Sequence, residues 1–218
     1  AARYGIARAE QDELAVESHA KAARAQAAGL LAHEIVPVTL GDGTVVDQDG
    51  CIRPGTSLEI LAGLKPAFRE DGFVTAGTAS PLTDGAVATL VTSEEFAAEH
   101  GLDVLARIRS TAVAGVEPEY MGIGPVPATR KALARAGLSV GDLDVVEINE
   151  AFGSQAVACL NELEIPRDVV NIDGGALALG HPLGATGARI TAKAAQILRR
   201  TGGRYALATQ CIGGGQGI

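Results

Sequence analysis

Residues 144–163 read DVVEINEAFGSQAVACLNEL and join a strand pattern directly to a helix pattern. The run DVVEI at 144–148 is apolar and β-branched, as in a buried strand, and residues 152–163 fit a helix. The same alternation extends to both sides. We expect further strands at 104–115, 169–172 and 204–210, and further helices at 127–136 and 186–200. Regular alternation of strand and helix predicts an α/β layered domain.

The first hundred residues are less regular. Acidic residues early and basic residues late, followed by Gly29, predict a helix over 9–28. Glycine and proline then break the chain between residues 34 and 73, where we expect one helix near 57–63. An apolar run predicts a buried strand at 86–91, and Ser93 begins a short helix that ends at Gly101.

Composition excludes several classes of protein. The 218 residues carry a formal net charge of -8, which is the wrong sign for a protein that coats nucleic acid. Its 3 cysteines are far apart and form no C-x-x-C pair, which disfavours a disulfide framework or a structural zinc site. With no long apolar run and no signal-peptide pattern, we expect a soluble, cytoplasmic protein that contacts neither membrane nor nucleic acid.

Glycine clusters mark the candidate site. The sequence has no P-loop and no dinucleotide fingerprint. Its glycines gather instead at 174–175, 180–187 and 213–217, where strands are expected to end and where α/β sheets bind ligands. His181, Cys211 and Asn149 accompany these ends. Each alone has a plain structural explanation, as a turn residue, a small buried hydrophobe and a helix cap respectively. Together at strand ends they indicate a catalytic site.

Three motifs carry a family resemblance. These are Asn149-Glu150-Ala151-Phe152, Gly180-His181-Pro182, and the Cys211–Gly217 run CIGGGQG. They stand in the order and form of the thiolases, which make or cleave the carbon–carbon bond of 3-oxoacyl-CoA thioesters. YMGIGP at 120–125 and TAGTAS at 75–80 are similar to that family too. The resemblance spans essentially the whole chain and implies a thiolase-like layered fold.

The resemblance also implies roles for residues. His181 would take the proton of a nucleophilic thiol, and Asn149 would fix a water beside the thioester oxygen. Cys211 would be the acid and base at the substrate α-carbon, because the unperturbed cysteine pKa of about 8.5 lies close enough to neutral for that work once donors stabilise the thiolate. The N–H of Gly213 would bind a second oxyanion.

Substrate contacts and partners follow from the same resemblance. Ser80 would touch the pantetheine arm of coenzyme A, and Met121 and Phe152 would line the acyl pocket. Acyl-CoA and CoA are the expected substrates, with no permanently bound cofactor and no metal. The family assembles as homodimers or homotetramers.

Two features of the family are missing from this sequence: the acyl-accepting cysteine and the final strand. Neither Cys51 nor Cys159 stands in the context of the acyl-accepting cysteine, and no strand follows the final glycine loop. We therefore expect the carboxyl-terminal part of a thiolase, truncated at both ends. Residues 1–82 would end the CoA-covering loop domain, 83–101 would close the amino-terminal half, and 102–218 would form the C-terminal domain without its last strand.

Two other functions stay open. A β-ketoacyl synthase-type enzyme shares this architecture but needs a histidine or asparagine where Cys211 stands. A catalytically incomplete dimerisation module would explain the missing nucleophile. The motifs do not distinguish synthesis from degradation or define an acyl length. The other histidines, His19, His33 and His100, are expected to be solvated.

Overall fold

The computed structural model describes all residues from 1 to 218, and they divide into two compact units. Unit 1 comprises residues 1–83, 149–162 and 171–181, and unit 2 comprises residues 84–148, 163–170 and 182–218. Each unit is built from segments far apart in the sequence. Asn149 and His181 fall in unit 1, whereas Cys211 falls in unit 2.

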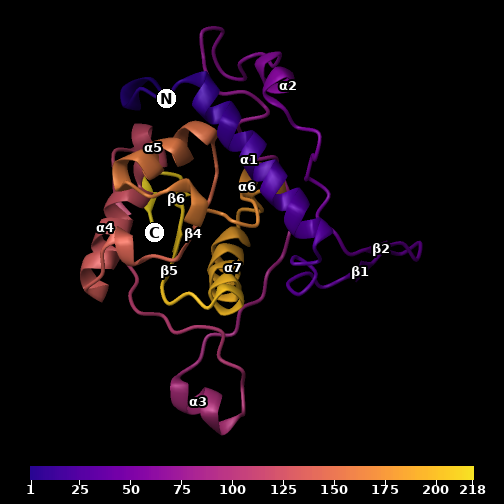
Figure 1. Cartoon of the computed structure of the whole chain (residues 1–218), viewed down its shortest axis with the longest axis vertical. Coiled ribbons are helices and arrows are strands. Elements are labelled where there is room, and N and C mark those ends of the chain that lie inside the picture. The colour runs from indigo at the N-terminus through magenta and orange to yellow at the C-terminus, as the bar shows by residue number, and fades with distance from the viewer. The chain divides into compact units, whose positions relative to one another are not determined.

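Unit 1 is mainly helical and is organised around one long helix (Figure 1). Its elements are η1 (Ala2–Tyr4), α1 (Arg8–Ala27), β1 (Val38–Thr39), β2 (Val45–Val46), α2 (Leu58–Ala62), α6 (Ala176–Leu179) and all but the last residue of α5 (Gly153–Leu163). Helix α1 starts where Glu10 accepts the Ala7 N–H at 2.7 Å, which satisfies an otherwise free donor of the first turn. It packs against α2 and α6.

Small side chains allow α1 and α6 to approach closely. Their shared core contains Ala22, Ala25 and Ala178, together with Leu31 and Leu179. Gly174, just before α6, has a φ of 92° and lies so close to α1 that an added Cβ would come within 2.5 Å of the Ala22 Cβ. Only glycine meets both conditions.

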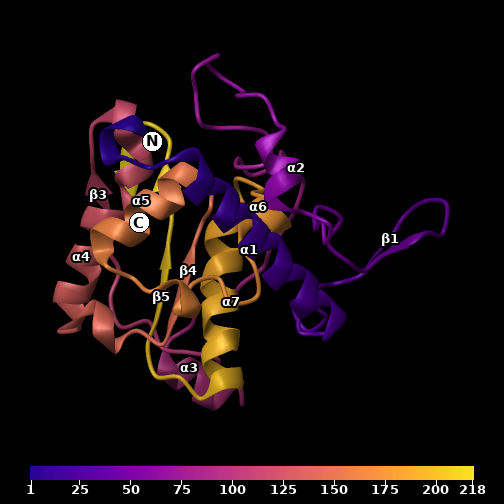
Figure 2. The same cartoon turned by 45° about the horizontal axis from the view of Figure 1, so that its top comes forward.

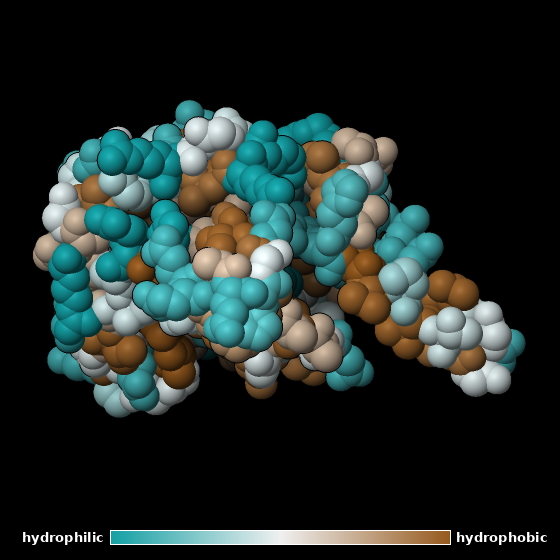
Figure 3. Space-filling view, turned by 90° about the horizontal axis from the view of Figure 1, so that it is seen from below, coloured by the Kyte–Doolittle hydropathy of each residue, from teal (hydrophilic) through white to brown (hydrophobic).

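The β1–β2 hairpin of unit 1 is the exception to this packing. Val38 pairs with Val46 in antiparallel register, and the hairpin extends beyond the end of α1 (Figure 1). Apolar side chains cover it in the space-filling view (Figure 3), with Val38, Val45 and Val46 between 47% and 56% exposed. An isolated two-stranded hairpin has little stability of its own in water.

Unit 2 holds two small sheets. The first pairs β4 (Val145–Ile148) with β5 (Ala206–Thr209) in parallel, and α7 (Thr186–Thr201) packs against both strands (Figure 2). The second is antiparallel, in the order β3 (Ala114–Gly115), β7 (Gln216–Gly217) and β6 (Cys211–Ile212). The remaining elements are α3 (Glu94–Glu99), η2 (Pro118–Ile123), α4 (Pro125–Ala136), η3 (Val140–Asp142) and η4 (Arg167–Val169).

The predicted helices and the strands at 144–148 and 204–210 are confirmed within a few residues. Three strand predictions are wrong. Residues 86–91 form no strand and are exposed, and of 104–115 only Ala114–Gly115 is a strand. Residues 169–172 make a single bridge, Val146 to Val170. A strand requires a hydrogen-bonded neighbour, and residues 86–91 and 104–113 pair with no segment of this chain.

Two further observations concern burial. His19 is only 7% exposed, so the expectation that it is solvated is wrong, whereas His33 and His100 are exposed as expected. None of the helices combines the length and apolarity that crossing a bilayer requires. The predicted three-part division of the chain at residues 82 and 101 stays a prediction.

Candidate active site

Asn149 and His181 come together within unit 1. Asn149 directly follows β4 in the chain, and His181 follows α6 and Gly180. The Asn149 Nδ2 and His181 Nε2 atoms lie 3.5 Å apart, at the long limit of a hydrogen bond. Which atom donates depends on the histidine tautomer and on the orientation of the amide. The two motifs that the sequence separates by 32 positions therefore share one polar contact.

The other amide atom of Asn149 is left for a ligand. Asn149 is 0% exposed, and its Oδ1 accepts no hydrogen bond from the protein. Buried amide oxygens almost always have a partner, since leaving one unsatisfied costs about 1–3 kcal/mol. An acceptor of this kind is suited to hold a water molecule.

Gly180 fixes the path of the chain into His181. Its φ is 91°, and an added Cβ would come within 2.2 Å of the Thr83 Oγ1. The Thr83 hydroxyl in turn donates to the Pro81 carbonyl at 2.8 Å. The glycine before the histidine is therefore required by backbone conformation and by close packing.

A buried carboxylate lies beside Asn149 in the sequence. Glu150 is 1% exposed and accepts hydrogen bonds from Ser18 Oγ at 2.7 Å, Asn171 Nδ2 at 2.7 Å and the Leu177 N–H at 3.1 Å. Burial raises its pKa, and these hydrogen bonds together with the charge of Lys21 oppose that shift. Glu150 belongs to the Asn149–Phe152 motif, but no role could be assigned to it from the sequence, because its hydrogen-bond partners lie far away in the chain.

Gly175 lies against this carboxylate, whereas Gly174 lies against Ala22 of α1. A Cβ on Gly175 would lie 2.1 Å from the Glu150 Cδ, and the Gly175 N–H donates to Ser18 Oγ at 3.0 Å. The prediction that this pair follows a strand is wrong, because η4 and a single bridge precede it. Its glycines serve close packing.

Ser80 and Phe152 are also neighbours in unit 1. Ala79 and Phe152 form an antiparallel bridge, and the Ser80 N–H donates to the Ala151 carbonyl at 3.1 Å. The Phe152 ring meets Phe68 edge to face, with centroids 6.2 Å apart. The segment at 75–80 is thereby tied to the Asn149–Phe152 motif.

Cys211, Gly213 and Met121 belong to unit 2. Strands β4 and β5 are parallel and end at the same edge, and Cys211 follows β5 by one residue. Gly213 lies in the exposed turn between β6 and β7, with open space beside its Cα. Met121 is half-buried in η2, which packs against β6 and β7.

Glycine backbone contacts hold this turn in place. A Cβ on Gly217 would lie 2.0 Å from the carbonyl carbon and oxygen of Gly124. Gly215 has a φ of 94° and accepts the Val116 N–H at 2.8 Å. Gly215 and Gly217 of the CIGGGQG run thus lie against Val116, Pro118 and Gly124 without side chains between the backbones.

Burial raises the pKa of the Cys211 thiol to about 11. The side chain is 8% exposed, and loss of hydration disfavours the thiolate. In the resting site desolvation outweighs the backbone hydrogen bond that opposes it, so the pKa lies above the unperturbed value and the predicted acid–base role stays a prediction. The thiol is therefore protonated at neutral pH.

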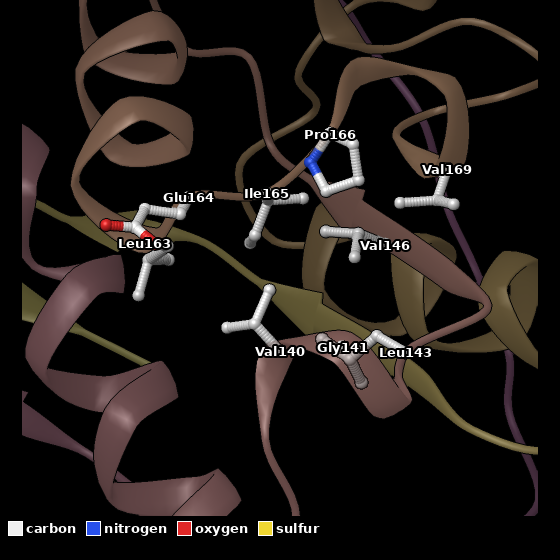
Figure 4. Close-up of a pocket in the computed structure, with 9 residues that line it drawn as sticks. All are labelled: Val140, Gly141, Leu143, Val146, Leu163, Glu164, Ile165, Pro166 and Val169. Carbon is white, nitrogen blue, oxygen red and sulfur yellow. The ribbon is translucent and has the colours of Figure 1, made fainter.

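A separate pocket of about 360 Å³ lies within unit 2 (Figure 4). Its lining is mostly apolar, with Val140, Val146 and Ile165 pointing inward and the Glu164 carboxylate at its edge. None of the predicted site residues lines it. No cluster of His, Cys, Asp and Glu side chains in the chain could hold a metal ion.

Comparison with known proteins gives the family of this chain. Residues 102–218 match the family model "Thiolase, C-terminal domain", and residues 1–95 match "Thiolase, N-terminal domain". The chain belongs to the thiolase family. The assignment extends beyond the C-terminal domain, since the N-terminal domain model covers the first 95 residues.

Thiolases of known name are identical to this chain at about half of the aligned positions. It is 54% identical to the 3-oxoadipyl-CoA/3-oxo-5,6-dehydrosuberyl-CoA thiolase of Escherichia coli K12, over 98% of this chain and 55% of that protein. It is 52% identical to the acetyl-CoA acetyltransferase of Paracoccus denitrificans, over 100% of this chain and 56% of that protein. The chain thus spans about half the length of these thiolases.

The thiolase fold is confirmed by a solved structure. The crystal structure of the Bacillus anthracis acetyl-CoA acetyltransferase superposes with a TM-score of 0.94 at 46% identity. The match covers 99% of this chain and 56% of that one. The predicted α/β thiolase-like fold is therefore correct, although three of its expected strands do not form here.

Proposed function

We propose that the whole protein is a thiolase-type acyltransferase that forms or cleaves 3-oxoacyl-CoA thioesters. The contact between Asn149 and His181 carries this proposal. It places an imidazole nitrogen 3.5 Å from a buried amide whose Oδ1 has no protein partner. Thioester chemistry needs both a proton acceptor and a site for the carbonyl oxygen, and this pair offers the parts of each.

Acyl transfer to the enzyme is the first step. The His181 imidazole accepts the proton of a nucleophilic cysteine, which attacks the thioester carbonyl carbon. That cysteine is neither Cys51, which is half-buried, nor Cys159, which is buried inside α5. A water held by the Asn149 Oδ1 donates to the oxyanion, and the bond to the CoA sulfur then breaks.

Cys211 acts first as an acid and then as a base. Its raised pKa keeps the thiol protonated at rest, so its proton goes to the departing CoA thiolate. The resulting Cys211 thiolate removes the α-proton of a second acyl-CoA, whose carbanion attacks the acyl-enzyme carbonyl. The cysteine thiolate leaves and takes back its proton from His181, and the N–H of Gly213 binds the second thioester oxygen.

Substrate contacts and surroundings complete the proposal. Ser80 contacts the pantetheine arm, and Met121 and Phe152 line the acyl pocket. CoA and acyl-CoA are the substrates, as the names of the related thiolases state for those proteins. The protein works in the cytoplasm as a homodimer or homotetramer, without a permanently bound cofactor. The β-ketoacyl synthase alternative is disfavoured because a cysteine stands at position 211.

Two variants of the whole protein test the two roles separately. With His181→Ala, intact-mass spectrometry after mixing with acetyl-CoA should show acyl-enzyme formation slowed at least about 100-fold, the usual contribution of a general base. Cys211→Ser should still acylate but should no longer exchange the α-protons of acyl-CoA in D₂O. An alcohol is a far weaker acid and base than a thiol.

The exposed His33 provides a matched control, and His33→Ala should acylate and exchange normally. Normal acylation of His181→Ala would contradict the role of His181 as base. Loss of both half-reactions in Cys211→Ser would contradict the separation of roles.

A further inference from the structure

Glu150 is the most deeply buried carboxylate beside the candidate site, and the proposed reaction does not use it. Its two oxygens accept hydrogen bonds from three donors, one on the 1–83 segment of unit 1 and two on the 171–181 segment. Ser18 lies on α1, Asn171 precedes the glycine pair, and the Leu177 N–H belongs to the first turn of α6. Together with Ser18, whose Oγ also accepts the Gly175 N–H, the Glu150 side chain links all three segments of unit 1.

Stability does not account for this arrangement. Desolvating a carboxylate is unfavourable, and burial accordingly raises the pKa of Glu150. The hydrogen bonds to Glu150 oppose this cost without cancelling it, since its pKa stays raised. Asn171, one of its donors, also holds a φ of 43°, a conformation that non-glycine residues seldom adopt. An unfavourable charge next to an unfavourable backbone conformation is typical of a functional site.

The position of Glu150 connects the two motifs. Its backbone follows Asn149 directly, while its carboxylate holds the amide of Leu177 at 3.1 Å. Two residues after Leu177 helix α6 ends, and Gly180 then leads into His181, held against Thr83. One side chain therefore joins the segment that carries Asn149 to the segment that carries His181.

We propose that Glu150 is a positioning residue that sets the contact between Asn149 and His181. It touches neither substrate nor the reacting atoms, and acts through the amide of Leu177 and the hydroxyl of Ser18. Its catalytic consequence rests on the proposed function. Its effect on His181 does not, because the hydrogen bond of the imidazole can be observed without any substrate.

Glu150→Gln is the first test, since glutamine keeps the shape but replaces one acceptor oxygen by an NH₂ donor. That donor would face a group that now donates to the carboxylate, so at least one of the three hydrogen bonds must be lost or rearranged. In the whole protein with ¹⁵N-labelled histidine, we expect the His181 Nε2 resonance to move and its tautomer population to change. We expect kcat to fall about 10–100-fold with KM unchanged, as for a small misplacement of catalytic groups.

Ser18→Ala is the second variant and stays informative if Glu150→Gln does not fold. It keeps the carboxylate and removes one of three donors, so the same changes should appear with smaller size. Leu14→Ala is the matched control, because Leu14 is buried on the same helix and is not one of the hydrogen-bond donors to Glu150. It should lower the free energy of unfolding by about 2–5 kcal/mol while leaving the His181 resonance and kcat unchanged.

The outcomes separate the two proposals. A wild-type His181 resonance in both Glu150→Gln and Ser18→Ala would overturn the positioning role. Equal losses of kcat in Leu14→Ala and Ser18→Ala would overturn it too, because they would reflect stability alone. A shifted resonance in a protein without thiolase turnover would keep the positioning role and refute the proposed function.

Discussion

The two units hold their candidate catalytic residues by different means. In unit 1, Asn149 and His181 stand beside a buried carboxylate with three hydrogen-bond donors. In unit 2, the turn after Cys211 is held by glycines whose backbones touch Gly124 and Val116. Unit 1 therefore relies on directional polar bonds, whereas unit 2 relies on the absence of side chains.

This difference determines how each unit responds to change. A polar network can lose one hydrogen bond while most of its side chains stay in place, since the remaining donors still bind. Two backbones in direct contact have no atoms that can rotate away. We therefore expect unit 2 to be more sensitive to a single added methyl group, and unit 1 to be more sensitive to pH.

Gly217→Ala should give the largest effect. Its Cβ would lie 2.0 Å from the Gly124 carbonyl, so β7 and η2 must separate. We expect the free energy of unfolding to fall by about 3 kcal/mol and Cys211-dependent α-proton exchange to be lost. Urea denaturation of the whole protein measures the change in the free energy of unfolding. The control is Gly141→Ala, whose Cβ would meet only the Ser139 Oγ at 3.9 Å, and a loss within about 1 kcal/mol of this control would contradict the contact.

Gly175→Ala applies the same test to unit 1 and should have a smaller effect. The added Cβ meets the Glu150 carboxylate at 2.1–2.3 Å, and a side chain can move where a backbone cannot. We expect a loss of about 1–2 kcal/mol in denaturation, together with the His181 shift expected for Glu150→Gln. Gly50, which has open space around it, provides the control Gly50→Ala. A loss larger than that of Gly217→Ala would reverse the comparison between the units.

His19 adds a second buried polar contact to unit 1 and makes its stability depend on pH. Its Nδ1 accepts the Arg53 N–H at 3.1 Å, and burial, followed by the charge of Arg53, lowers its pKa below 6.5. The folded state thus binds this proton less well than the unfolded state, so stability is present above pH 6.5 and is lost as the pH falls through the folded pKa.

For one proton, the free energy of unfolding is expected to change by at most about 1.4 kcal/mol per pH unit. Glu150 has a raised pKa, so its contribution to the free energy of unfolding changes with pH in the opposite direction. The contribution of His19 is therefore measured as a difference between variants. Subtracting the denaturation profile of His19→Gln from that of the wild type should leave the slope of His19 alone. His33→Gln should reproduce the wild-type profile, and a flat difference for His19→Gln would refute the proposed linkage.

The sequence predicted elements whose signals are local. Helices α1, α4 and α7 and strands β4 and β5 follow from periodicity, capping and β-branched runs. The segments 86–91 and 104–113 carry equally apolar patterns yet are not strands, since pairing depends on a neighbour that pattern does not reveal. Long-range partners thus limit what can be read from one sequence.

The candidate site shows the same limit. Asn149, His181 and Cys211 could be named because they stand in recognisable motifs. The contact between Asn149 and His181 agrees with the prediction that these two residues belong to one site. The bond from Ser18 to Glu150 spans 132 positions and left no local signal. Nor could spacing predict that burial raises the pKa of Cys211 to about 11, because desolvation depends on the packed environment.

The smallest effect is expected at Glu164, where unit 2 again depends on backbone conformation. It follows α5 with a φ of 55°, the left-handed conformation that often ends helices and that glycine or asparagine adopts more readily. Its side chain is exposed, so Glu164→Asn removes little packing. We expect the free energy of unfolding to rise by about 0.5 kcal/mol in urea denaturation. Glu162→Asn, inside the same helix, is the matched control and should be neutral or destabilising, because asparagine is a poorer helix former than glutamate. Equal changes in both variants would mean that side-chain identity, and not the backbone conformation at residue 164, determines stability there.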